Sequence, residues 1–271
     1  MMNKTMRRVG GVVLSAVFAG SVLTACGNDE EENAASDQVV SSEDDRPVEE
    51  RFEWQARAAD PNGILIFQPK GSESKGQILS TETRSYEPGS EEAKTSEPEG
   101  VVFQLVDFSP VEPVPFSESD GPTGFDGMVP TGYTQSAAGA ALAAAAYAAA
   151  AFSPNYPEFI EKASVGATEE TRKRVESVAA QIAQDKETLR SVHTVGRAPA
   201  SEGVRVELIR PDYARVTIYS RGEKENGMQG LIALTRDLEW VDGQWKMNIS
   251  SNPSVSESDQ LPEEAWTWNQ S

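Results

Sequence analysis

The chain has 271 residues, a formal net charge of −19, a single cysteine and a single histidine. A surface this acidic repels phosphate backbones, so nucleic acid is not an expected partner. One cysteine cannot form an intramolecular disulfide, and the sequence has no Cys/His cluster of the kind that binds zinc. The length allows one to two domains, and beyond the N-terminal region no run reaches the ~18–20 strongly apolar residues of a membrane-spanning helix.

Residues 1–25 have the layout of a secretory signal. A positive start is followed by an uncharged apolar run over residues 9–22 and by two small residues, Thr24 and Ala25. The run is too short and too weakly apolar for a durable spanning helix. The positive charges are Lys4, Arg7 and Arg8, and cleavage would bring the formal net charge from −19 to −22.

The sequence Leu23-Thr24-Ala25-Cys26 ends this signal. It resembles the bacterial lipobox, which implies that Cys26 receives a diacylglyceryl group and becomes the mature N-terminus. Two acyl chains anchor a protein stably where one is marginal, at ~0.8 kcal/mol per buried methylene. The protein is therefore expected on the cell membrane, lipid-anchored on the extracytoplasmic face. The alternative is an ordinary cleaved signal with a chance cysteine.

Residues 26–50 are expected to form a disordered acidic tether. Residues 27–50 hold ten acidic residues against one base, Arg46, and no aromatic residue. Such a segment cannot bury enough apolar surface to offset its chain entropy. Its mean span as a flexible chain is roughly 25–30 Å. A calcium site is the alternative, but no Asp-x-Asp-x-Asp-Gly loop is present.

Residues 51–100 combine short strands with a flexible loop. Ile64-Leu65-Ile66-Phe67 predicts a short buried strand after the turn Pro61-Asn62-Gly63. Residues 70–100 are polar and predict a long loop. Residues 101–106 predict a strand, after which Pro110, Pro113 and Pro115 favour an extended, polyproline-like path. These pieces are too short for a core of their own and are expected to wrap the following domain.

The domain at residues 101–251 is expected to contain three helices. Between Ala137 and Ala151, twelve of fifteen residues are alanine, which predicts a buried helix capped by Thr134 or Ser136. A short helix is predicted over residues 157–163. Thr168 is expected to cap a longer one whose apolar face holds Val175, Val178, Ala179, Ile182 and Leu189.

Alternating strands follow the helices. Asp242-Gly243 is a strong two-residue hairpin signal. Its register pairs Trp240 with Trp245 and Leu238 with Met247 on one face, and Glu239 with Lys246 on the other. The tail at residues 252–271 is polar apart from Trp266 and Trp268, which are expected to dock on the domain rather than to face a partner.

The sequence offers little catalytic chemistry. It has no Gly-x-Ser-x-Gly elbow, no P-loop and no Rossmann glycine pattern. The lone histidine, His193, is interpreted as a loop or packing residue. Asp126 and Asp212 are the available acids for a cavity mouth, but an Asp in a turn usually serves the turn. We expect no catalytic residue, no cofactor and no metal site.

The order of three helices and a four-strand antiparallel run, ending in residues 239–246, resembles the cone-shaped α+β fold of nuclear-transport-factor-2-like domains. The expected fold is thus three N-terminal helices packed on a four-stranded antiparallel sheet. A second series of residues resembles an uncharacterised family of actinobacterial envelope lipoproteins over residues 101–251. That series is Val102-Phe103-Gln104, Pro115, Gly121-Pro122-Thr123, Gly127, Thr131-Gly132-Tyr133 and Gly139-Ala140-Ala141-Leu142-Ala143-Ala144.

The family pattern often has a histidine after the Gly-Tyr pair, where this chain has Thr134 and Gln135, so no role for that histidine carries over. Related domains occur in conjugation-channel proteins, which implies a role in a secretion or conjugation assembly. The expected function is a non-catalytic interaction or scaffold protein of the cell envelope, with an envelope protein as partner. The alternative is a lipoprotein that binds a small molecule or a cell-wall ligand in the open end of the cone. An isomerase or hydrolase is a further alternative.

Overall fold

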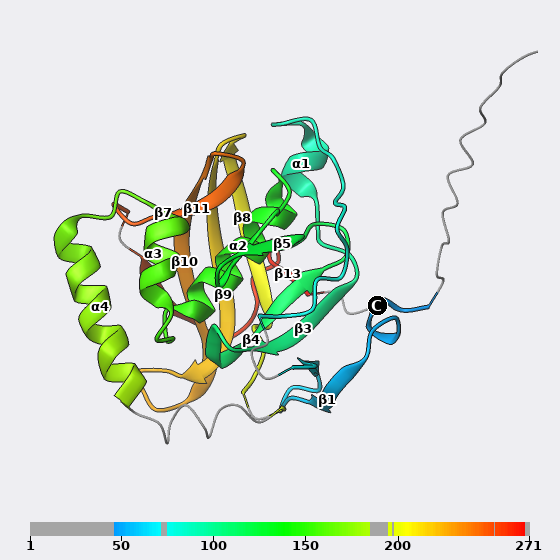
Figure 1. The fold of residues 1–271 in the computed structure, drawn as a ribbon, viewed down its shortest axis with the longest axis horizontal. Coiled ribbons are helices and arrows are strands. Elements are labelled where there is room, and N and C mark those ends of the chain that lie inside the picture. Colours follow the sequence, from blue (N-terminus) through cyan, green and yellow to red (C-terminus); the bar gives the residue numbers. More distant parts are fainter. Residues whose placement is uncertain (1–45, 72–74, 185–194, 197, 252, 269–271) are drawn as a thin grey trace, which may run out of the picture. The chain divides into compact units, whose positions relative to one another are not determined.

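The computed structural model describes residues 46–71, 75–184, 195–196, 198–251 and 253–268 (Figure 1). Cys26 and His193 lie outside these residues. The helices are η1 (Val48–Glu50), α1 (Glu91–Thr95), α2 (Ala137–Ala150), α3 (Tyr156–Lys162) and α4 (Glu169–Gln184). The first strands are β1 (Trp54–Ala59), β2 (Leu65–Pro69), β3 (Val101–Val106), β4 (Ser109–Ser117), β5 (Gly124–Asp126), β6 (Val129–Thr131) and β7 (Ser164–Val165). The later strands are β8 (Gly203–Arg210), β9 (Tyr213–Glu223), β10 (Gln229–Val241), β11 (Gln244–Asn248), β12 (Ser254–Ser258) and β13 (Trp266–Thr267).

The first sheet has four strands in the order β1-β2-β3-β4. Strands β2 and β3 are parallel, and the other two pairings are antiparallel. The proline-rich segment after residue 108 is extended as expected, but it is strand β4 rather than an isolated polyproline-like path. Proline is tolerated there because β4 is an edge strand, where some N–H groups need no ladder partner.

Two segments that were predicted to lie outside the folded domain contribute side chains to its core. Val48, assigned to the tether, is 2% exposed. Residues 70–100, predicted to be a loop, contain helix α1; Leu79 and the α1 residue Ala93 are buried, and Gln77 exchanges hydrogen bonds of 2.6 and 2.9 Å with the side chain of Gln104. This segment therefore packs on the first sheet.

The second sheet has seven strands in the order β13-β8-β9-β10-β11-β7, with β12 also paired to β10. Strands β8 to β11 form the antiparallel run expected from the alternating pattern. The hairpin register is confirmed, since Trp240 pairs with Trp245 and Leu238 with Met247. Both turn residues have positive φ, 54° at Asp242 and 75° at Gly243, as a type I′ turn requires.

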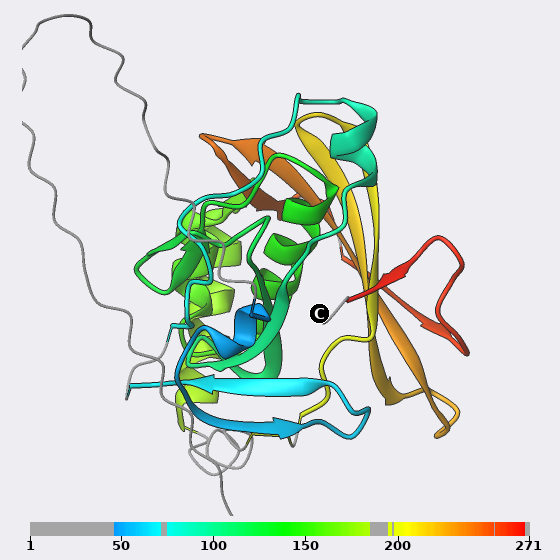
Figure 2. The ribbon, with the colours of Figure 1, turned by 90° about the vertical axis from the view of Figure 1, so that its right-hand side faces the viewer.

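Helix α2 lies between the two sheets (Figure 2) and contacts β4 on one side and β8, β9 and β11 on the other. All of its residues are buried, as the alanine run predicts. Alanine suits this position because its small side chain lets both sheets approach the helix closely while favouring helix. Ser136 is the N-cap, and its hydroxyl accepts from the Gly139 N–H at 3.2 Å.

Polar contacts fix α2 to the second sheet. Tyr147 donates its hydroxyl to the carbonyl of Trp245 at 3.0 Å, and the Trp245 indole N–H donates to the carbonyl of Thr134 at 2.9 Å. The C-terminal tryptophans also dock, as predicted. Trp268 is 6% exposed, packs edge-on against Phe103 and donates to the Ser201 hydroxyl at 2.9 Å.

Helix α4 is amphipathic but packs lightly. Thr168 caps it as predicted, accepting from the Thr171 N–H at 3.1 Å. Ala179 is its only buried residue, and Val178 is 46% exposed. Leu189, expected on the same face, lies outside the described residues.

The predicted fold class is wrong. The described residues form thirteen strands in several sheets and only four α-helices, one of them before β3, rather than three N-terminal helices on a four-stranded sheet. Helices α2, α3 and α4 and the β10–β11 hairpin were predicted from local patterns, but α1 lies within residues 70–100, which were predicted to be a loop. The error came from pairings over long sequence separations, namely β2 with β3, β7 with β11 and β12 with β10. Among the helices of the described residues, none combines the length and the apolar character needed to cross a bilayer.

Candidate functional site

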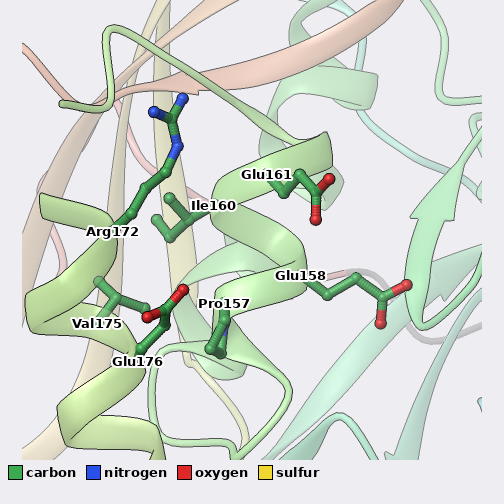
Figure 3. A pocket seen from close by; sticks show the side chains of 7 residues that line it. All are labelled: Pro157, Glu158, Ile160, Glu161, Arg172, Val175 and Glu176. Carbon is green, nitrogen blue, oxygen red and sulfur yellow. The ribbon is translucent and has the colours of Figure 1, made fainter. Parts of the chain in front are cut away.

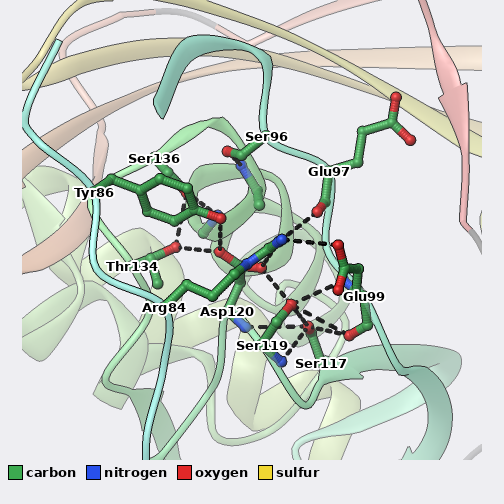
Figure 4. Close-up of polar contacts among 12 residues, drawn as sticks. Arg84, Tyr86, Ser96, Glu97, Glu99, Ser117, Ser119, Asp120, Thr134 and Ser136 are labelled. Atoms are coloured by element: carbon green, nitrogen blue, oxygen red, sulfur yellow. Dashed lines mark hydrogen bonds and ion pairs between the residues drawn. The ribbon is translucent and has the colours of Figure 1, made fainter. Parts of the chain in front are cut away.

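A buried polar cluster surrounds Asp120, whose side chain is fully buried (Figure 4). One carboxylate oxygen accepts from the hydroxyls of Tyr86 at 3.1 Å and Thr134 at 2.8 Å. The other accepts from Arg84 Nη2 and from the Ser119 hydroxyl, each at 2.6 Å. Four donors fill the acceptor capacity of a carboxylate, so Asp120 has no site left for a substrate proton.

This cluster connects distant segments. Arg84 comes from the loop before α1, Asp120 follows β4, and Thr134 precedes α2. Its partners also include Glu99, which pairs with Arg84 at 2.9 Å, and Ser136, within 2.8 Å of the Thr134 hydroxyl. Several residues that carry the resemblance lie next to it in sequence, among them residues 121–123 and 131–133.

Asp60 is a second buried carboxylate and accepts three backbone hydrogen bonds. It accepts backbone N–H groups from Asn62 and Ile64, both at 2.8 Å, and from Ala200 at 2.9 Å. The last bond joins the β1–β2 turn to the segment before β8. Asp60 therefore organises a turn and holds two parts of the chain together.

A cleft with a volume of about 410 Å³ lies between α3 and α4 (Figure 3). Its apolar lining includes Ile160 and Val175. Its charged residues are Glu158, Glu161, Arg172 and Glu176. Glu158 accepts from Lys162 at 2.8 Å and points away from Val175 in Figure 3. The cleft is thus an acidic surface feature with one of its carboxylates already paired.

A more apolar groove, of about 320 Å³, lies between the C-terminal end of α2 and the second sheet. We call this the apolar groove. Two of its apolar residues are strongly exposed, Phe152 at 55% and Val255 at 67%. Its residues are Glu112, Pro113, Ala145, Ala148, Phe152, Ser201, Ile218, Ser220, Arg221, Ile232, Leu234 and Val255.

The polar groups of the apolar groove are few. Arg221 forms an ion pair with Glu202, and the Ser201 hydroxyl accepts from Trp268. Glu112 is the one carboxylate in the lining, and burial raises its pKa. An apolar hollow with few polar groups and a perturbed acid has the composition of a binding site.

The structure does not bring together Asp126 and Asp212, the two acids that the sequence offered for the mouth of a cavity. Asp126 pairs with Lys162 at 2.8 Å, and Asp212 pairs with Arg210 at 3.0 Å. Their side chains are 62% and 59% exposed, so both are surface acids. Within the described ranges, no group of His, Cys, Asp and Glu side chains could hold a metal ion.

Sequence reasoning missed the apolar groove. Phe152 and Val255 each interrupt a small or polar context, after the alanine run and within the C-terminal tail. Such isolated apolar residues were the available signal. Nothing local shows that they meet, because β12 is brought to β10 by a long-range pairing.

The described residues form a mostly β-sheet domain with four α-helices, two hydrogen-bonded buried acids and an open apolar groove. The chain belongs to the family described as Domain of unknown function (DUF8175), which matches residues 68–265. The matched range includes the Asp120 cluster, the cleft between α3 and α4, and the apolar groove. Neither a curated protein nor a solved structure matches the chain.

Proposed function

We propose that this protein is a membrane-anchored extracytoplasmic lipoprotein that acts as a non-catalytic interaction protein of the cell envelope. The observation that carries the proposal is the apolar groove, where Phe152 and Val255 present apolar surface to solvent. Exposed apolar patches of this kind typically mark interaction sites. The anchor rests on the sequence at Cys26 and on the signal before it.

Two further features support an interaction role over catalysis. The buried acids Asp60 and Asp120 are each held by several hydrogen bonds that join distant segments of the chain, which accounts for both by a structural role. Helix α2 fills the space between the two sheets, so the interior is packed with side chains. A partner would therefore bind on the surface.

The finer assignment rests on sequence alone. The likeness of residues 101–251 to actinobacterial envelope lipoproteins favours an envelope partner, within a secretion or conjugation assembly. The acidic segment after Cys26 would serve as a spacer between membrane and domain.

A crosslinking pull-down of the full chain from its own cells tests the proposal. We expect Phe152→Asp to remove the specific partner, because it places a charge in the apolar groove. Met228→Asp is the matched control, since Met228 is 58% exposed but lies outside the groove. Cys26→Ser should lose both membrane attachment and the partner. Equal capture by the wild type and Phe152→Asp would contradict the role of the groove.

A second candidate is the binding of a small apolar molecule in the same groove. Glu112 favours it, since it is the one carboxyl group in the lining and burial raises its pKa. This candidate predicts that small molecules raise the melting temperature of the purified chain and that Phe152→Asp abolishes the effect. A protein partner without any such thermal shift would exclude it.

A further inference from the structure

A separate pocket of about 360 Å³ lies where the first turns of α4 approach α3 and β10. It shares no lining residue with the apolar groove. Its lining includes two arginines, Arg174 from α4 and Arg236 from β10. In a chain with a net charge of −19, two guanidinium groups in one pocket are an unusual concentration of positive charge.

The guanidinium group of Arg236 lacks hydrogen-bond partners in the part of the chain that the structure describes. Its Nε atom is buried and has no hydrogen-bond partner. Among the described residues, no carboxylate lies within ion-pair distance of its guanidinium group, although most other arginines of the second sheet, such as Arg215 and Arg221, are paired. A buried polar group without a partner is costly, and a bound anion would offset the unpaired charge of the Arg236 guanidinium.

Other groups of the pocket complement an anion. Arg174 is exposed and, within the described part of the chain, forms no ion pair, so its guanidinium is available at the rim. Tyr156 lines the pocket, and burial raises its pKa while the nearby Arg236 lowers it by less. The phenol therefore stays protonated at neutral pH and can donate a hydrogen bond.

Part of the remaining wall is apolar, beside the hydroxyl groups of Thr168, Thr171 and Ser251. Ile160, Val175 and Ile249 line the same pocket. Figure 3 shows Ile160 and Val175 at the junction of α3 and α4, which this pocket shares with the neighbouring cleft. A ligand that fits has an anionic group at the arginines and an apolar body against these side chains.

We propose that this pocket binds a small organic anion, whose phosphate or carboxylate group lies between Arg236 and Arg174 and whose apolar part packs on Ile160, Val175 and Ile249. Guanidinium groups suit both anions because their planar fork donates two parallel hydrogen bonds. Binding at this pocket does not depend on the interaction role of the apolar groove.

One acid opposes the anion. Glu170 also lines the pocket, four residues before Arg174 on the same helix. Its carboxylate reduces the positive potential there. Removing this charge should strengthen anion binding, which is the opposite of the effect expected for the arginines.

Isothermal titration calorimetry of the full chain in a non-ionic detergent tests the proposal, with hexyl phosphate, hexanoate, inorganic phosphate and neutral hexanol as probes. We expect saturable binding of at least one organic anion, weakened about tenfold or more by Arg236→Gln and by Arg174→Gln. Lys173→Gln is the matched control, because Lys173 carries the same charge on the same helix and pairs instead with Glu169. Glu170→Gln should tighten binding.

The results of this titration distinguish the type of ligand and show whether the site exists. Tighter binding of hexyl phosphate than of hexanoate assigns a phosphate ligand, and the reverse assigns a carboxylate. Absence of saturable binding by both organic anions, or equal weakening by Arg174→Gln and Lys173→Gln, would overturn the site. Hexanol or inorganic phosphate binding as tightly as the organic anions would overturn the combined anionic and apolar recognition. Arg174 is exposed, so its variant tests the site even if Arg236→Gln unfolds the chain.

Discussion

Arg84 and Asp120, which are 36 residues apart in sequence, form an ion pair of 2.6 Å between Nη2 and Oδ2. The Asp120 side chain is fully buried, and that of Arg84 is 34% exposed. The pair joins the loop before α1 to the segment after β4. This contact holds the polar loop of residues 75–100 against the domain.

Removing the acid tests this contact. Asp120→Ala removes the buried acceptor shared by Arg84, Tyr86 and Thr134, and we expect a loss of about 2–4 kcal/mol in the free energy of unfolding. Urea denaturation measures it. Asp126→Ala is the control, since it removes an exposed ion pair with Lys162 and should cost under about 1 kcal/mol. Equal losses for the two variants would contradict a structural role for the cluster.

Gly139 tests the close packing at the start of α2. Alanine favours helix over glycine by about 1 kcal/mol, but a Cβ at this position would meet the Thr134 carbonyl oxygen at 2.1 Å. That oxygen also accepts from Trp245. We expect Gly139→Ala to destabilise the protein by about 1–3 kcal/mol.

Gly124→Ala is the control for that variant. Its nearest neighbour would be the Thr131 hydroxyl oxygen at 3.7 Å, an ordinary contact. Thermal unfolding should show a lowered melting temperature for Gly139→Ala and little change for Gly124→Ala. A melting temperature that rises in Gly139→Ala would show that helix propensity outweighs the contact.

The lowered pKa of Asp237 predicts that the free energy of unfolding falls at acidic pH. Its hydrogen bonds to Arg215, at 2.8 and 3.1 Å, lower its pKa from 3.8 to about 2. Because the folded-state pKa lies below the unfolded value, its stabilising contribution is present above pH 3.8 and is lost as the pH falls toward 2. Arg215→Gln should flatten the dependence of the unfolding free energy on pH in this range. Arg210→Gln, which removes an exposed pair, should leave the slope unchanged, and identical slopes in both variants would contradict the assignment.

The raised pKa of Glu112 predicts a pH dependence of the unfolding free energy that is opposite in sign to that of Asp237. Burial raises its pKa above 4.5, so its contribution is most favourable below that value and is lost as the pH rises through the folded-state pKa. Glu112→Gln should therefore stabilise the protein near neutral pH and have little effect at acidic pH. Chemical denaturation at the two pH values measures this. A variant less stable than the wild type at neutral pH would mean that the Glu112 carboxylate has a stabilising partner.

Local patterns predicted some elements, namely α2, α3, α4 and the β10–β11 hairpin, but they missed α1 and β12. The alanine run specifies α2, because alanine favours helix and fits between two closely packed sheets. Asp242-Gly243 fixes the β10–β11 register, because the turn and the alternation of Trp240, Trp245, Leu238 and Met247 agree. In both cases the information lies within a few residues of the element.

The arrangement of the elements could not be predicted in the same way. Strand β2 pairs in parallel with β3 across an intervening polar loop, and β12 joins β10 from the C-terminal tail. Neither pairing leaves a local pattern. The apolar groove could not be predicted either, because it depends on Phe152 and Val255, which come together from distant segments of the chain.

The central claim, that the apolar groove binds an envelope partner, is tested most directly by site-specific photo-crosslinking in the cells that make the protein. A photoreactive residue at position 255 of the full chain lies in the groove, and one at position 228 lies outside it. We predict a discrete crosslinked partner from position 255 that is absent from position 228 and is lost with Phe152→Asp. Identical crosslinking from both positions, or none from position 255, would contradict the claim.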